Sequence, residues 1–239
     1  MKVLLLHTCG AEASAALADT GLVAAIVAEA RMPGRTASER LVAAVRELME
    51  GAGWALAELG AIAVVSGPGS FTGVRVGLSA AKGLSEASGV PLVAVSRLAL
   101  VVGVAQSHTG DVCAVLDAGR GEFYCGRYVG GDCVTESLVG LEEALRLAGK
   151  AGVAVACEAK VAEALSLELV EEPSAADALP IVLERLRLGL FEDAETMDAN
   201  YLRRTDAEIF AKPGGGEERQ WPVVRCVQVD GENEQRQER

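Results

Sequence analysis

The chain has 239 residues, half of them apolar, which is enough for one large domain or two modest domains with real hydrophobic cores. Its formal net charge of −12 at pH 7 argues against direct, unaided binding to nucleic acid, because that binding depends on neutralising phosphates. No apolar run is long and uninterrupted enough to span a bilayer. The short apolar N-terminus lacks a cleavage site and is expected to be a core strand.

The first half of the chain alternates apolar strand patterns with amphipathic helix patterns. One helix is expected over residues 38–50, where Leu41, Val42, Val45, Leu48 and Met49 share one face. A second helix is expected to begin after the N-cap Ser70 and to end at Gly89. The remaining elements are predicted to be strands at 2–8, 13–17, 22–28, 61–65 and 90–95, and a helix at 96–106.

The helix after Ser70 carries small residues at every fourth position: Gly69, Gly73, Gly77, Ala81 and Ser85. Each glycine inside a helix costs about 1 kcal/mol relative to alanine, so the pattern indicates that another backbone approaches closely. Three interpretations remain open. The helix packs tightly on its own sheet, the glycine loop cradles a phosphate, or the helix contacts a helix of another subunit.

The second half of the chain repeats this order of elements. We expect strands at 112–116, 122–129, 133–139 and 153–157, and helices at 141–148 and 175–188. Both halves are thus predicted to run strand, strand, strand, helix, strand, helix. The architecture is duplicated although the residues themselves show little repeat.

Six cysteines are scattered among apolar residues, at positions 9, 113, 125, 133, 157 and 226. None forms a C-x-x-C pair, which argues against a zinc ribbon or a thioredoxin-type motif. We expect reduced core thiols in a cytoplasmic protein.

The segment from Gly67 to Gly77, Gly-Pro-Gly-Ser-Phe-Thr-Gly-Val-Arg-Val-Gly, resembles the signature of the TsaB (YeaZ) family. The resemblance implies an α/β fold of the actin/Hsp70/sugar-kinase (ASKHA) class, built from two ribonuclease-H-like βββαβα domains. We expect these domains at residues 1–108 and 109–192. Residues 193–212 are expected to pack back on the body, and the polar tail, 213–239, to be partly disordered.

The resemblance implies a non-catalytic partner of TsaD, the enzyme that makes threonylcarbamoyladenosine on tRNA. It further implies a TsaD-like partner, a TsaE-like ATPase, and only indirect contact with tRNA; a homodimer is also possible. ATP and a metal ion are expected in the partner subunits, and no cofactor is expected to bind firmly to this chain. The residues predicted to contact the partner are Ser70, Phe71, Gly73, Val74, Gly77, Leu78 and Ala81.

Two departures from related enzymes argue against catalysis by this chain. Arg97 and Val101 stand where a TsaD-like sequence has two metal-binding histidines, and no metal site is expected here. His7-Thr8 replaces an Asp-Thr pair at the end of the first strand, which makes Mg-nucleotide binding doubtful. The alternative hypothesis is a self-sufficient metallopeptidase or small-molecule kinase of the same fold.

Two further groups of residues are candidates for a site. A degenerate nucleotide cleft is predicted from His7, Thr8, Gly67 and Gly69. A polar patch at the cleft or at a partner surface is predicted from Asp117, Arg120, Glu122 and Tyr124, which match a family motif; the other interpretation is a charged turn that enters a strand.

Overall fold

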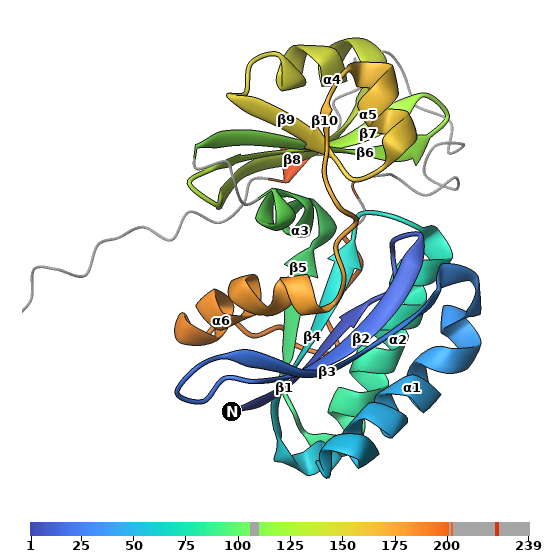
Figure 1. Cartoon of the computed structure of the whole chain (residues 1–239), viewed down its shortest axis with the longest axis vertical. Coiled ribbons are helices and arrows are strands. Elements are labelled where there is room, and N and C mark those ends of the chain that lie inside the picture. Colours follow the sequence, from blue (N-terminus) through green and yellow to red (C-terminus); the bar gives the residue numbers. More distant parts are fainter. Residues whose placement is uncertain (106–109, 201, 203–222, 225–239) are drawn as a thin grey trace, which may run out of the picture.

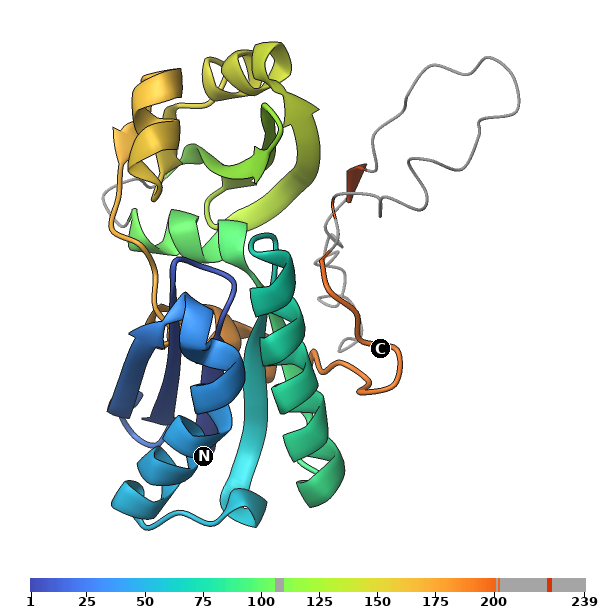
Figure 2. The same ribbon diagram turned by 90° about the vertical axis from the view of Figure 1, so that its right-hand side faces the viewer.

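The computed structural model describes residues 1–105, 110–200, 202 and 223–224. These residues form two mixed β-sheets, each covered by helices, with helix α3 lying between the two halves (Figure 1). Figure 2 shows the same arrangement from the side, with α1 and α2 running next to each other along the first sheet. Within the described residues, no helix is both long and apolar enough to cross a membrane.

The first sheet has the strand order β3-β2-β1-β4-β5. Strands β1, β2 and β3 form an antiparallel meander, and β4 and β5 join β1 in parallel. The centre of the sheet is buried on both faces, because β1 and β4 are almost entirely apolar. The strands are β1 Lys2–His7, β2 Glu12–Asp19, β3 Ala25–Pro33, β4 Leu59–Gly67 and β5 Leu92–Ser96.

Helices α1 (Ala37–Ala52) and α2 (Phe71–Ser88) cover one face of this sheet. Helix α1 buries Leu41, Val45 and Met49, which recur every four residues. Helix α2 begins where the Ser70 hydroxyl accepts a hydrogen bond from the Gly73 amide, and it ends at Gly89 in the left-handed conformation. Both ends of α2 agree with the sequence prediction.

The second sheet repeats the topology of the first. Its order is β10-β9-β6-β7-β8-β11, so β6 takes the place of β1, and β9 that of β4. The duplicated architecture expected from the sequence is therefore confirmed. The elements are β6 Asp111–Gly119, β7 Glu122–Val129, β8 Asp132–Gly140, α4 Leu141–Ala148, β9 Val153–Ala156, α5 Ala159–Leu165, β10 Glu168–Leu169 and β11 Val223–Val224.

The two halves exchange their last helices. Helix α3 (Arg97–Val104) follows β5 but places Leu98 and Val101 in the core of the second sheet. Helix α6 (Leu179–Arg187) follows the second unit but packs Leu179 and Val182 into the core of the first sheet. The predicted boundary at residue 192 is therefore wrong: the second unit closes with α5, which the sequence analysis missed, and the chain returns to the first sheet before α6.

The C-terminal part of the chain corrects one expectation and agrees with another. Met197 and Leu202 are buried in the two cores, as expected for a segment that packs back on the body. Val223 and Val224, however, form a strand on β8, whereas the sequence analysis assigned them to a polar tail. Residues 201, 203–222 and 225–239, which include the rest of the predicted tail, lie outside the described residues.

The cysteines correct another prediction. Cys9, Cys113, Cys125 and Cys157 are buried free thiols, as expected. Cys133 is disulfide-bonded, so the prediction of reduced thiols is wrong at this position. Cys226 lies outside the described residues.

Candidate functional site

The small-residue stripe of α2 faces its own chain. A Cβ added to Gly73 would collide with the carbonyl oxygen of Thr8, and one added to Gly77 would collide with the Thr8 hydroxyl. A Cβ on Gly69 would meet the carbonyl oxygen of Cys9 in the same way. The glycines therefore let α2 lie directly on the end of β1, which is the internal-packing interpretation.

This packing corrects the predicted partner contact. Gly73, Val74, Gly77, Leu78 and Ala81 are buried within the chain and cannot touch another subunit while it is folded. Of the predicted residues, Ser70 and Phe71 are exposed. The surface of α2 that remains available is the adjacent face.

Two backbone amides at the start of α2 donate their hydrogen bonds within the protein. The Ser70 amide donates to the carbonyl oxygen of Cys9 at 3.0 Å, and the Gly73 amide donates to the Ser70 hydroxyl at 3.3 Å. Both groups would have to point outward to hold a phosphate. The contacts favour a structural role for Gly67 and Gly69 over the phosphate-loop interpretation.

An open groove of about 590 Å³ runs between α1 and α2. Two large apolar side chains beside it are solvent-exposed, Val42 by 62% and Phe71 by 53%. The guanidinium of Arg75 lies 3.6 Å from the centre of the Phe71 ring, which fixes a cation on this apolar surface. The groove is lined by Ser38, Leu41, Val42, Phe71, Thr72, Arg75, Val76, Ser79 and Ala80.

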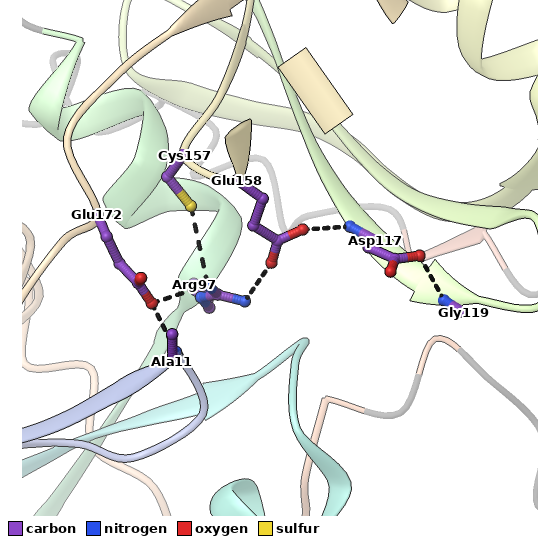
Figure 3. Close-up of polar contacts among 7 residues, drawn as sticks. All are labelled: Ala11, Arg97, Asp117, Gly119, Cys157, Glu158 and Glu172. Atoms are coloured by element: carbon purple, nitrogen blue, oxygen red, sulfur yellow. Dashed lines mark hydrogen bonds and ion pairs between the residues drawn. The ribbon is translucent and has the colours of Figure 1, made fainter. Parts of the chain in front are cut away.

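Arg97, the first residue of α3, is buried between the two halves of the molecule (Figure 3). Its Nη1 lies 3.2 Å from Glu158 Oε1, and its Nη2 lies 3.3 Å from Glu172 Oε1. Nη2 also lies 3.7 Å from the sulfur of Cys157. A fixed positive charge thus occupies the centre of this polar cluster.

The surrounding groups keep Arg97 charged. Burial works against the charge, but the negative charges of Cys9 and Cys157 in their ionised form, and of the Glu158 and Glu172 carboxylates, raise the pKa of Arg97 above its usual value. Burial raises the pKa of Cys9 and of Cys157 to about 11, so both are neutral thiols at pH 7. The two carboxylates are therefore the groups that neutralise the guanidinium.

His7 is fully buried at the end of β1. Burial, together with the charge of Arg97, lowers its pKa from 6.5 to about 3, so the imidazole is neutral at pH 7. Neither ring nitrogen has a hydrogen-bond partner among the described residues. A neutral side chain sealed inside the core is not placed to bind a nucleotide, although Thr8, the next predicted cleft residue, lies against α2.

The predicted polar patch is split by the structure. Asp117 and Arg120 are exposed at the β6–β7 turn, whereas Tyr124 is buried in the core of the second sheet. Glu122 begins β7 and is partly buried. The backbone amide of Asp117 donates to Glu158 at 2.7 Å, which ties the turn to the Arg97 cluster.

Neither of the two carboxylates that hold Arg97 was predicted from the sequence. Glu158 directly follows a predicted strand, and a charged residue at a strand end was an available signal. Glu172 lies in an irregular connection, where no periodicity marks it.

A buried carboxylate, Glu136, was missed as well. It accepts hydrogen bonds from the hydroxyls of Ser96 and Tyr128, both at 2.5 Å, and from the side-chain amide of Asn200 at 2.8 Å. It lies in β8 at the start of a continuous buried run, Glu136–Val139. Across the described residues, no group of three or more His, Cys, Asp or Glu side chains is arranged to hold a metal ion.

Comparison with known proteins agrees with this architecture. Residues 31–180 match the TsaD family, described as tRNA N6-adenosine threonylcarbamoyltransferase. The Escherichia coli tRNA threonylcarbamoyladenosine biosynthesis protein TsaB is 33% identical over 130 residues, 54% of this chain and 55% of that protein. An uncharacterized protein of Mycobacterium tuberculosis is 33% identical over 186 residues, 74% of this chain and 80% of its own.

The match extends to about half the length of the first curated relatives, 55% of the Escherichia coli protein and 40% of TsaB from Bacillus subtilis. A match to a solved structure covers a larger share of both chains. A Pseudomonas aeruginosa protein described as similar to peptidase YeaZ superposes with a TM-score of 0.72 at 29% identity, covering 84% of this chain and 99% of that one. The fold class predicted from the sequence is confirmed, and the chain belongs to the TsaB (YeaZ) family, within the wider group that includes TsaD.

Proposed function

We propose that the chain is a non-catalytic subunit that enables a TsaD-like partner to transfer a threonylcarbamoyl group to adenosine of tRNA in the cytoplasm. The observation that carries this proposal is the groove between α1 and α2. It combines exposed Val42 and Phe71 with the cation of Arg75 on one face. Such an apolar surface with a charged rim is typical of a protein interface.

The groove also suggests the kind of contact that the partner makes. Helices α1 and α2 leave between them a groove that an apolar helix of the partner can enter. A second copy of this chain is an alternative occupant, because a surface that fits a related subunit can also fit the same surface on an identical copy. We propose the TsaD-like subunit as the occupant, with a TsaE-like ATPase joining the complex.

The interior of the chain supports a non-catalytic role. Arg97 holds a permanent positive charge between Glu158 and Glu172, and like charge repels a metal cation. Val101, at the second histidine position of TsaD-like sequences, is buried in the core and offers no ligand atom. We therefore assign the ATP and the metal ion to the partner subunits.

The charge of the chain supports indirect contact with tRNA. A net charge of −12 gives few phosphate contacts, so the basic surface should come from a partner. Filter binding of tRNA by the chain, by the partner and by the pair tests this division. Tight, salt-sensitive binding by the chain alone would contradict it.

The decisive test is reconstitution of the tRNA modification with and without this chain. We expect the TsaD-like partner and the ATPase to modify tRNA efficiently only when the chain is present, and the chain alone to show no transferase, peptidase or kinase turnover. Wild-type levels of modification without the chain would overturn the proposal. Turnover by the chain alone, abolished by a point mutation within it, would instead support a self-sufficient enzyme.

A further inference from the structure

A continuous series of polar contacts crosses from the first sheet to the second through Arg97 (Figure 3). At one end, the amide of Ala11, in the turn between β1 and β2, donates to Glu172 Oε1 at 2.7 Å. Glu172 binds Arg97 at 3.3 Å, and Arg97 binds Glu158 at 3.2 Å. At the other end, Glu158 Oε2 accepts from the amide of Asp117 at 2.7 Å.

The two ends of this series are equivalent places in the duplicated fold. Ala11 follows β1, the central strand of the first sheet, and Asp117 lies near the end of β6, the central strand of the second sheet. The series therefore joins the turn after one central strand to the end of the other central strand. No ligand is needed to link these two places, because the side chains of the protein reach across.

The burial of Arg97 strengthens its ion pairs with Glu158 and Glu172. The Arg97 side chain is 4% exposed, and each carboxylate is 28% exposed. The charge of this guanidinium is balanced only while both carboxylates stay in contact with its Nη1 and Nη2 atoms, since a buried unpaired charge is costly. Its Nε has no hydrogen-bond partner among the described residues, so the guanidinium depends on these two contacts. Opening the two halves would separate Arg97 from Glu172 or Glu172 from Ala11.

We propose that Arg97, Glu158 and Glu172 form an interdomain clasp that holds the two sheets in one closed arrangement by means of the chain's own side chains. The clasp does not depend on the partner proposed above. It makes closure a fixed property of this chain and not a response to a bound ligand.

A second link between the sheets determines how the chain would open. Asn200 donates its backbone amide to the carbonyl oxygen of Ser66 at 2.8 Å and its side-chain amide to Glu136 at 2.8 Å. These contacts do not involve the clasp. Loss of the clasp should therefore rotate the sheets about α3 and Asn200 without separating them.

The test compares Arg97→Ala with the full parent chain. We expect a larger radius of gyration in small-angle X-ray scattering, and hydrogen exchange at the Ala11 amide at least tenfold faster. Added guanidinium ion should restore both values, whereas urea at the same concentration should not. The matched control is Arg127→Ala, which removes a surface arginine paired with Asp111 and should change Ala11 exchange less than twofold.

Glu172→Gln provides a second variant that keeps the size of the side chain and tests the clasp should Arg97→Ala fail to fold. It should accelerate exchange at Ala11 and increase the radius of gyration, because the neutral amide no longer balances Arg97. An unchanged radius of gyration in Glu172→Gln, with Ala11 exchange within twofold of the parent chain, would overturn the proposal.

Discussion

Thr8 and Gly73 fit together so closely that no other residue can replace the glycine without movement. The Thr8 hydroxyl donates to the carbonyl oxygen of Gly73 at 2.6 Å. The carbonyl oxygen of Thr8 lies where a Cβ of residue 73 would need space. The contact locks the first turn of α2 onto the end of β1 and explains a glycine that is costly inside a helix.

We predict that Gly73→Ala destabilises the chain by about 1–3 kcal/mol, because a backbone oxygen cannot yield as a flexible side chain can. Gly83 is the matched control in the same helix, since a Cβ there meets nothing within 4 Å. Gly83→Ala should stabilise by about 1 kcal/mol. Urea unfolding of both variants measures the two effects. A folded, equally stable Gly73→Ala that lost only subunit association would restore the interface interpretation of the stripe.

The buried His7 should make stability depend on pH. Its pKa is about 3 in the folded chain against an ordinary value of 6.5, so the unfolded chain binds a proton that the folded chain refuses. Stability should therefore fall as pH drops below about 6.5, by about 2 kcal/mol between pH 7 and pH 5. In His7→Leu this part of the loss should vanish. Urea unfolding at both pH values checks it, and an equal loss in the two chains would show that His7 is not its source.

The groove between α1 and α2 should tolerate a charge in the isolated chain but not in the complex. Val42→Glu should leave the free energy of unfolding within about 0.5 kcal/mol, because Val42 is 62% exposed. It should weaken binding of the TsaD-like partner at least tenfold in calorimetry. Leu141→Glu, at a residue of α4 that is 50% exposed on the second sheet, is the control and should bind normally. Normal binding by Val42→Glu would place the partner elsewhere.

The stability of the chain should be sensitive to Glu136→Gln, which replaces one carboxylate oxygen by an amide nitrogen. Burial and the neighbouring carboxylate raise the pKa of Tyr128 well above its usual value, so its hydroxyl remains a donor. In Glu136→Gln, an amide nitrogen would face donors from Ser96, Tyr128 or Asn200. We expect a loss of about 1–3 kcal/mol in thermal or urea unfolding. Glu47→Gln, on the exposed face of α1, should have no measurable effect, and a similarly neutral Glu136→Gln would contradict the hydrogen-bonded role.

The sequence alone was sufficient for the elements whose signals are local. The period of α1, the N-cap Ser70 and the end of α2 at Gly89 follow from contacts within a few residues, and all three are found in the structure. The Gly67–Gly77 signature identified the family, and the repeated order of elements predicted two similar sheets. These features depend on side-chain pattern and capping, which the linear sequence contains.

Tertiary structure decided which partners those elements meet. A stripe of glycines requires a close backbone, but only the folded chain shows that this backbone is Thr8, directly after β1, and not another subunit. The sequence showed that Arg97 stands where related enzymes have a metal-binding histidine. It did not show the carboxylates that pair with Arg97, because Glu158 and Glu172 lie 61 and 75 positions further along the chain. The exchange of α3 and α6 could not be predicted for the same reason. An apolar helix face shows that the helix is buried, but the hydrophobic effect has no direction. The sequence therefore does not say against which of the two sheets each helix packs.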